Sequence, residues 1–145
     1  MIERHSASTP QGVLRLGGPL AVAAAVGAAC VVVWISDPTT PGGPLPSCPT
    51  KLLLGIDCPG CGSLRMLYSL LHGDLGAAVG FNALGLVALV LLAWSYSAWS
   101  YGRLRGRTIP SWQHHRWAPP LTLTLVSVWF LLRNLPFEPF SALHV

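Results

Sequence analysis

The chain has 145 residues, of which 52% are hydrophobic and only 10% carry a charge. This composition, with a mean hydropathy of +0.53, excludes an ordinary soluble domain, because such domains contain about 25% charged residues. It predicts an all-α integral membrane protein in which residues 1–145 form a single membrane domain. The formal net charge of +4 is small, so it indicates contact with anionic lipid rather than with nucleic acid.

Three apolar blocks have roughly the length that a membrane-spanning helix needs. They cover about residues 13–35, 75–101 and 117–133. The first block also resembles a cleaved signal sequence, since Gly27-Ala28-Ala29-Cys30 is similar to the small residues before a lipoprotein cysteine. The apolar run continues as far as Ile35, which favours a retained span with Cys30 buried in the helix.

The loop of residues 36–74 separates the first two predicted spans. Its first part, residues 36–50, is rich in proline, so neither a helix nor a strand is expected to run through it. From Ser63 onward, apolar residues recur at every third or fourth position, which predicts a short amphipathic interfacial helix. Gly73 is expected to end this helix, and Asp74 to cap the second span by accepting hydrogen bonds from its first backbone N–H groups.

The positions of the basic residues predict the orientation in the membrane. Six of the nine basic residues lie before the first span or in the loop of residues 102–116. Cytoplasmic loops retain Lys and Arg, so we expect the amino terminus and the loop of residues 102–116 inside. The loop of residues 36–74 and the carboxyl terminus are expected outside.

Three cysteines in the outer loop allow three kinds of chemistry, because thiols can pair, bind a metal or react. One disulfide among Cys48, Cys58 and Cys61 is expected in an oxidising compartment, and a bridge from Cys48 to Cys58 would contribute about 3 kcal/mol. The second interpretation is a metal site formed by the three thiolates, with His72 as the fourth ligand. The third is a reactive thiolate at Cys61, favoured by a helix amino terminus and by Arg65 one turn away.

Several of these residues resemble the signature of a family of small bacterial membrane proteins of unknown function. That signature reads Cys-Pro-x-Cys-Gly-x-Thr-Arg, followed by Gly-Asp and by Asn-Pro. The matching segments here are Cys48-Pro49, Cys58-Pro59-Gly60-Cys61-Gly62-Ser63-Leu64-Arg65, Gly73-Asp74 and Asn82. Leu64 replaces the Thr of the family, and Ala83 replaces its Pro, which predicts a straighter second span. Some relatives resemble accessory subunits of the respiratory supercomplex that joins cytochrome bc to cytochrome c oxidase.

Polar and small residues inside the second span predict packing. Asn82 lies about 12 Å along the helix from Asp74 and needs a polar partner there. Gly76 and Gly80 give the helix a small-residue face, so we expect them, with Arg65, to contact other helices or a partner. No paired carboxylates, nucleophile triad or phosphate loop is present, so no catalytic residue and no cofactor are predicted.

Two functional hypotheses follow. The first is a non-catalytic accessory or assembly subunit in the bacterial plasma membrane, which docks on other membrane subunits through its spans and a disulfide-stapled outer loop. The resemblance implies that these partners belong to the cytochrome bc / cytochrome c oxidase supercomplex. The alternative is a membrane thiol-redox or metal-handling factor that uses Cys58 and Cys61.

Overall fold

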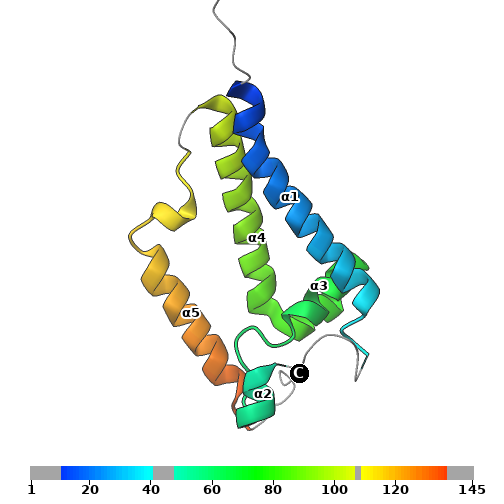
Figure 1. Ribbon diagram of the computed structural model, residues 1–145. Coiled ribbons are helices and arrows are strands. Elements are labelled where there is room, and N and C mark those ends of the chain that lie inside the picture. Colours follow the sequence, from blue (N-terminus) through cyan, green and yellow to red (C-terminus); the bar gives the residue numbers. More distant parts are fainter. Residues whose placement is uncertain (1–10, 41–47, 107–108, 137–145) are drawn as a thin grey trace, which may run out of the picture.

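The computed structural model describes residues 11–40, 48–106 and 109–136, and these residues form helices and no strand. The elements are α1 (Gln11–Ser36), α2 (Pro49–Leu54), α3 (Ser63–Leu71), α4 (Leu75–Arg105), the 3-10 helix η1 (Trp112–His114) and α5 (Ala118–Arg133) (Figure 1). The all-α prediction is therefore confirmed. α2 begins within the proline-rich stretch that was predicted to be non-helical, with Pro49 in its first turn, where a missing N–H costs nothing. Most of that stretch, residues 41–47, lies outside the described residues.

Two helices are long and apolar enough to cross a membrane, namely Leu16–Ser36 within α1 and Leu75–Arg105. Only 11% of the apolar window of each is buried inside the protein, so most of their apolar surface faces outward, as expected of helices in lipid. α5 has 16 residues. At about 24 Å it is shorter than a hydrocarbon core of about 30 Å. Two of the three predicted spans thus have the required length.

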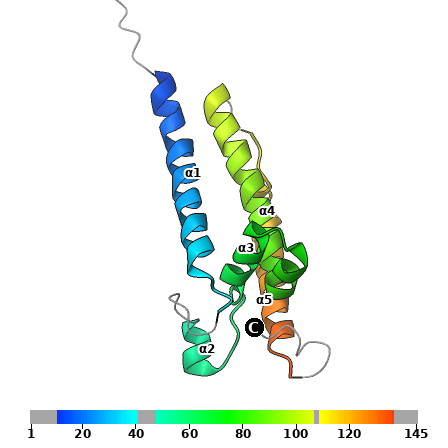
Figure 2. The ribbon, with the colours of Figure 1, turned by 90° about the vertical axis from the view of Figure 1, so that its right-hand side faces the viewer.

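The long helices spread apart toward one end of the molecule. α1 and α4 approach each other where α1 begins and α4 ends, and at the opposite end α3 packs between them (Figure 1). α5 lies on the other side of α4, and α2, α3 and the end of α5 gather at the same end (Figures 1 and 2). Segments that are distant in the sequence therefore meet at this end.

The junction between α3 and α4 follows the predicted cap chemistry. Gly73 has a φ of +79°, a left-handed conformation that glycine adopts without steric cost and that ends α3. The Asp74 carboxylate accepts a hydrogen bond from the backbone N–H of Ala77 at 2.9 Å. This bond satisfies one of the free donors in the first turn of α4.

The prediction of a straighter second span is wrong. Asn82 has φ −162° and ψ 86°, so α4 is kinked there although no proline follows. The Asn82 side chain accepts a hydrogen bond from the backbone N–H of Gly85 at 2.8 Å, as an N-cap residue does. The side chain of Asn82 therefore restarts the helix after the kink.

Gly76 and Gly80 of α4 do not pack against another helix within the described part of the chain, and their contact with a partner stays a prediction. Gly76 and Gly80 are exposed, and a Cβ atom at Gly80 would meet nothing within 4 Å. Close approach occurs instead at Gly18 of α1, whose Cβ position lies 3.3 Å from Arg103 and 3.4 Å from Trp99. These contacts hold the start of α1 against the end of α4.

Candidate functional site

Three cysteine side chains converge where α2, α3 and α5 meet. Cys48 directly precedes α2, and Cys58 and Cys61 lie in the turn before α3. The Sγ atom of Cys58 is 3.3 Å from that of Cys48 and 3.1 Å from that of Cys61. All three Sγ atoms lie within 4.8 Å of one another. The structure therefore brings together the three thiols that the sequence indicates.

The turn from Cys58 to Cys61 is closed by its own backbone. The Cys61 N–H donates to the Cys58 carbonyl at 3.0 Å, and the Cys58 N–H donates to the Cys61 sulfur at 3.1 Å. Pro59 and Gly60 occupy the central positions, where the fixed φ of proline favours a tight turn. Both thiols consequently project to the same side of the turn.

Gly62 holds this turn close to α4. Its φ is +78°, and an added Cβ atom would lie 2.6 Å from the backbone oxygen of Phe81. Real Cβ atoms essentially never approach an oxygen so closely. A residue with a side chain at this position is therefore excluded by both the backbone conformation and the available space.

Two fully buried polar side chains clamp the turn from the other helices. Asn82 of α4 donates to the carbonyls of Pro59 at 3.1 Å and Cys61 at 3.2 Å. Arg133 of α5 donates from Nη1 to the same Cys61 carbonyl at 2.7 Å, and from Nη2 to Phe81 at 3.2 Å. Both side chains are 0% exposed. The position of Cys61 thus depends on helices that lie far from it in the sequence.

A second pair of contacts fixes the segment before Cys58. The Asn134 amide accepts from the Asp57 N–H at 3.0 Å and donates to the Asp57 carbonyl at 2.9 Å. The Asp57 carboxylate, which is only 2% exposed, forms an ion pair with Lys51 of α2 at 3.2 Å. These bonds connect α2, the cysteine turn and the end of α5.

The three thiols differ in their electrostatic environment. A hydrogen bond with the Thr50 hydroxyl, followed by those with Cys61 and Cys58, lowers the pKa of Cys48 to about 6. Burial, followed by the hydrogen bonds with Cys58 and Cys48, raises the pKa of Cys61 to about 12. In the absence of a ligand, this environment therefore favours the thiolate form of Cys48 and the neutral thiol form of Cys61.

The predicted disulfide is not formed in the structure, in which all four cysteines of the chain are free. A disulfide bond is about 2.05 Å long, whereas the closest pair, Cys58 and Cys61, is 3.1 Å apart. Cys58 lies at similar distances from both other thiols, so no unique pair is favoured. Cys30, which is partly exposed in α1, is not part of the group.

Two residues predicted near the cysteines lie elsewhere. His72 is the C-cap residue of α3, and its ring stacks on Trp34 at a centroid distance of 4.1 Å. The Arg65 Nε donates to the Pro38 carbonyl at 3.1 Å. Both side chains therefore face the end of α1, and His72 does not complete the group of three thiols.

Sequence reasoning missed Arg133 and Asn134. Arg133 is the last residue of the third predicted span, 117–133, and no role was predicted for it. The available signal was an Arg-Asn pair at the end of an apolar helix, where a charged group is costly unless it finds partners. Their partners near the cysteine turn are backbone groups 52 to 77 residues away, and no local pattern indicates them.

Residues 48–96 match the family described as "Protein of unknown function (DUF2752)". This agrees with the family of unknown function that the sequence resembles. The matched segment contains the three cysteines, α3 and most of α4, including Asn82, whereas Arg133 and Asn134 lie outside it. No curated protein and no solved structure shows significant similarity to the chain.

Proposed function

We propose that this chain is a membrane protein that binds a thiophilic metal ion, Zn²⁺ or Cu⁺, through Cys48, Cys58 and Cys61. The observation that carries this proposal is the convergence of three Sγ atoms within 4.8 Å. Three thiolates around a tetrahedral Zn²⁺ at about 2.3 Å have sulfur atoms roughly 3.8 Å apart. The distances of 3.3 Å and 3.1 Å need to increase by about 0.5 Å and 0.7 Å to reach this geometry.

The surrounding contacts support a preorganised site. The clamp formed by Asn82 and Arg133 on the Cys61 carbonyl holds the turn in place without contribution from a ligand. Such supporting bonds orient metal ligands and are a common part of metal sites. Soft thiolate donors select Zn²⁺ and Cu⁺ over Mg²⁺ and Ca²⁺, which defines the class of metal.

The charge around the site also favours a metal–thiolate centre. Arg133 is fully buried, and its hydrogen bonds within the described chain go to two backbone carbonyls. Burial of an unbalanced charge costs several kcal/mol. Zn²⁺ with three thiolates has a net charge of −1, which balances the guanidinium.

The number of ligands points to metal handling rather than to a closed structural site. Structural zinc sites have four protein ligands, whereas sites that exchange ligands retain an open position. Among the described residues, three cysteines form the group, and His72 faces α1. A metal held in this way has one coordination position for a ligand from a partner or from solvent.

Titration of the reduced, detergent-solubilised protein with Co²⁺ tests this proposal, because Co²⁺–thiolate complexes have a characteristic near-ultraviolet absorption and Zn²⁺ displaces the cobalt. We expect one ion per chain for the wild type and for Cys30→Ser. We expect Cys58→Ser to bind at least about 100-fold more weakly. A wild-type protein that binds no ion, or a Cys30→Ser variant that loses as much affinity as Cys58→Ser, would contradict the proposal.

A second candidate function is the accessory or assembly subunit of a larger membrane complex, for which the resemblance suggests the respiratory supercomplex. The supporting observation is an apolar surface on α2, next to the cysteines. Leu52, Leu53 and Leu54 are 72%, 82% and 68% exposed, although α2 lies outside the candidate spans. Such a surface is typical of a contact with another protein.

Purification of the tagged protein in a mild detergent tests the second candidate. We expect membrane subunits to be retained by the wild type and lost from Leu53→Ser, whose cysteine site is unchanged. Recovery of the wild type without any stoichiometric partner would rule out a stable accessory subunit, while metal binding would be unaffected. The two candidate functions can therefore fail separately.

The proposed orientation places the cysteines outside the plasma membrane, with α5 as a third crossing and the amino terminus in the cytoplasm. The positive charges near the start of α1 and around the end of α4 support it. In intact cells, a membrane-impermeant thiol reagent is expected to label the wild type and not a Cys48→Ser/Cys58→Ser/Cys61→Ser variant. Labelling only after the cells are opened would show that the cysteines face the cytoplasm and that the orientation is the opposite one.

A further inference from the structure

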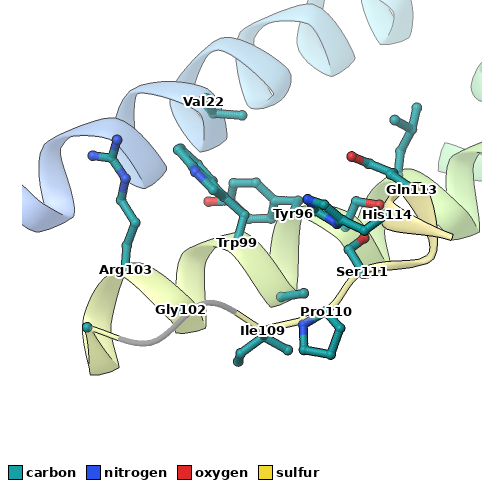
Figure 3. A pocket seen from close by; sticks show the side chains of 14 residues that line it. Val22, Tyr96, Trp99, Gly102, Arg103, Ile109, Pro110, Ser111, Gln113 and His114 are labelled. Atoms are coloured by element: carbon teal, nitrogen blue, oxygen red, sulfur yellow. Dashed lines mark hydrogen bonds between the residues drawn. The ribbon is translucent and has the colours of Figure 1, made fainter.

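A cavity of about 900 Å³ lies between α1, α4 and the segment of residues 109–114. It is located toward the end where α1 begins and α4 ends, away from the three cysteines (Figure 1). Figure 3 shows Val22 of α1 facing Tyr96 and Trp99 of α4. Ser111 and His114, from the segment of residues 109–114, lie beyond Tyr96. The volume is within the range of sites that hold a small molecule.

Hydrogen bonds connect the elements that surround this cavity. The Tyr96 hydroxyl donates to the Pro19 carbonyl of α1 at 2.8 Å. The Trp112 indole N–H donates to the Ser95 hydroxyl at 2.8 Å, and the hydroxyls of Ser95 and Ser111 are 3.2 Å apart. Both α1 and the segment of residues 109–114 are therefore hydrogen-bonded to α4.

The lining is apolar along its length and cationic at one end. Leu92, Ala98, Trp99 and Ile109 contribute apolar surface. The Arg103 guanidinium lies 5.2 Å from the centroid of the Trp99 ring, within the range of a cation–π interaction. None of the described residues that line the cavity is acidic. The charge of Arg103 is thus available to an anionic ligand.

We infer that this cavity binds one anionic phospholipid, with its phosphate at Arg103 and an acyl chain against the apolar wall of α1 and α4. A ligand here needs an anionic group and a long apolar part, because the cationic end continues into an apolar wall. Basic pockets between spanning helices recognise anionic headgroups in this way.

Native mass spectrometry of the detergent-solubilised protein tests this inference with phosphatidylglycerol and phosphatidylcholine of identical acyl chains. We expect the wild type to retain one phosphatidylglycerol in preference to phosphatidylcholine. Arg103→Gln should weaken phosphatidylglycerol binding about fivefold, which corresponds to about 1 kcal/mol for one basic residue near a lipid phosphate. Arg105→Gln is the matched control, because its guanidinium lies over Tyr101, which is outside the cavity.

Val22→Trp is a second variant, which fills the cavity without removing a charge. It should prevent retention of either lipid, while the helical circular dichroism signal stays at the wild-type level. An equal loss in Arg103→Gln and Arg105→Gln would show diffuse charge attraction and overturn the inference. Displacement of the lipid by inorganic phosphate alone, or full lipid retention by Val22→Trp, would also overturn it.

Discussion

Replacement of Arg133 by methionine is expected to weaken Zn²⁺ binding at the three cysteines by about 10- to 100-fold, the usual effect of removing a residue that supports metal ligands. The Arg133 guanidinium is 0% exposed and donates to the Cys61 carbonyl at 2.7 Å and to Phe81 at 3.2 Å. Methionine fills a similar volume but cannot donate. The turn that holds Cys58 and Cys61 therefore keeps only the Asn134–Asp57 connection to the end of α5.

In Arg133→Met, the free energy of Zn²⁺ binding is expected to change more than the free energy of unfolding. Loss of two hydrogen bonds from a charged donor costs about 1.5–3 kcal/mol each, but removal of a buried charge also removes a desolvation penalty of several kcal/mol. In folding, the lost hydrogen bonds and the removed desolvation penalty therefore oppose each other. In metal binding, the lost hydrogen bonds and the lost charge both weaken binding, because the positive charge of Arg133 favours a centre with a net negative charge.

Arg65→Met is the matched control, since Arg65 is partly buried and donates to the Pro38 carbonyl on the other side of α3. Zn²⁺ affinities are measured by competition with a chromophoric chelator, and helix content by circular dichroism. We expect Arg65→Met to bind Zn²⁺ like the wild type. Wild-type affinity in Arg133→Met, or an equal loss in both variants, would show that the contact with Cys61 does not support a metal site.

Gly62→Ala is expected to displace the cysteine turn from α4 and to weaken Zn²⁺ binding by at least about 10-fold, as for other changes that misplace ligands. The Cβ atom would lie 2.6 Å from the Phe81 oxygen, so the turn or α4 must move. This movement occurs next to the Cys61 carbonyl, to which Asn82 and Arg133 donate their hydrogen bonds. The geometry of all three thiols depends on those bonds.

Gly73→Ala is the control for the backbone strain alone. Gly73 has a φ of +79°, close to the +78° of Gly62, but an added Cβ atom there meets nothing within 4 Å. The left-handed conformation costs about 1–2 kcal/mol in either variant. We therefore expect Gly73→Ala to lower the thermal midpoint while Zn²⁺ affinity is unchanged. Comparable Zn²⁺ affinity in the two alanine variants would contradict the close packing of the turn on α4.

The parts of the fold that local chemistry determines could be predicted from the sequence. Apolar length indicated the two long helices, and the Gly73-Asp74 pair indicated the end of α3 and the cap of α4. Pro59 and Gly60, between Cys58 and Cys61, are residues typical of the tight turn that the structure shows there. Each of these features depends on residues that are close together in the sequence, either along one apolar run or within about one helical turn.

The parts that depend on distant residues could not be predicted. The absence of proline at position 83 suggested a straight helix, but Asn82 kinks α4 because its amide binds the cysteine turn 19 to 23 residues earlier in the chain. The contact of Arg133 with Cys61 spans 72 residues. His72 has the right donor atom for a metal, yet its stacking on Trp34 of α1 directs it away from the thiols.

X-ray absorption at the zinc edge tests the proposed metal centre most directly. After the reduced protein has been loaded with one equivalent of Zn²⁺, we expect a first shell that contains three sulfur atoms at about 2.3 Å. Cys30→Ser should give the same spectrum, and Cys58→Ser should lose sulfur from the shell. A first shell without sulfur in the loaded wild-type protein would contradict a metal centre formed by Cys48, Cys58 and Cys61.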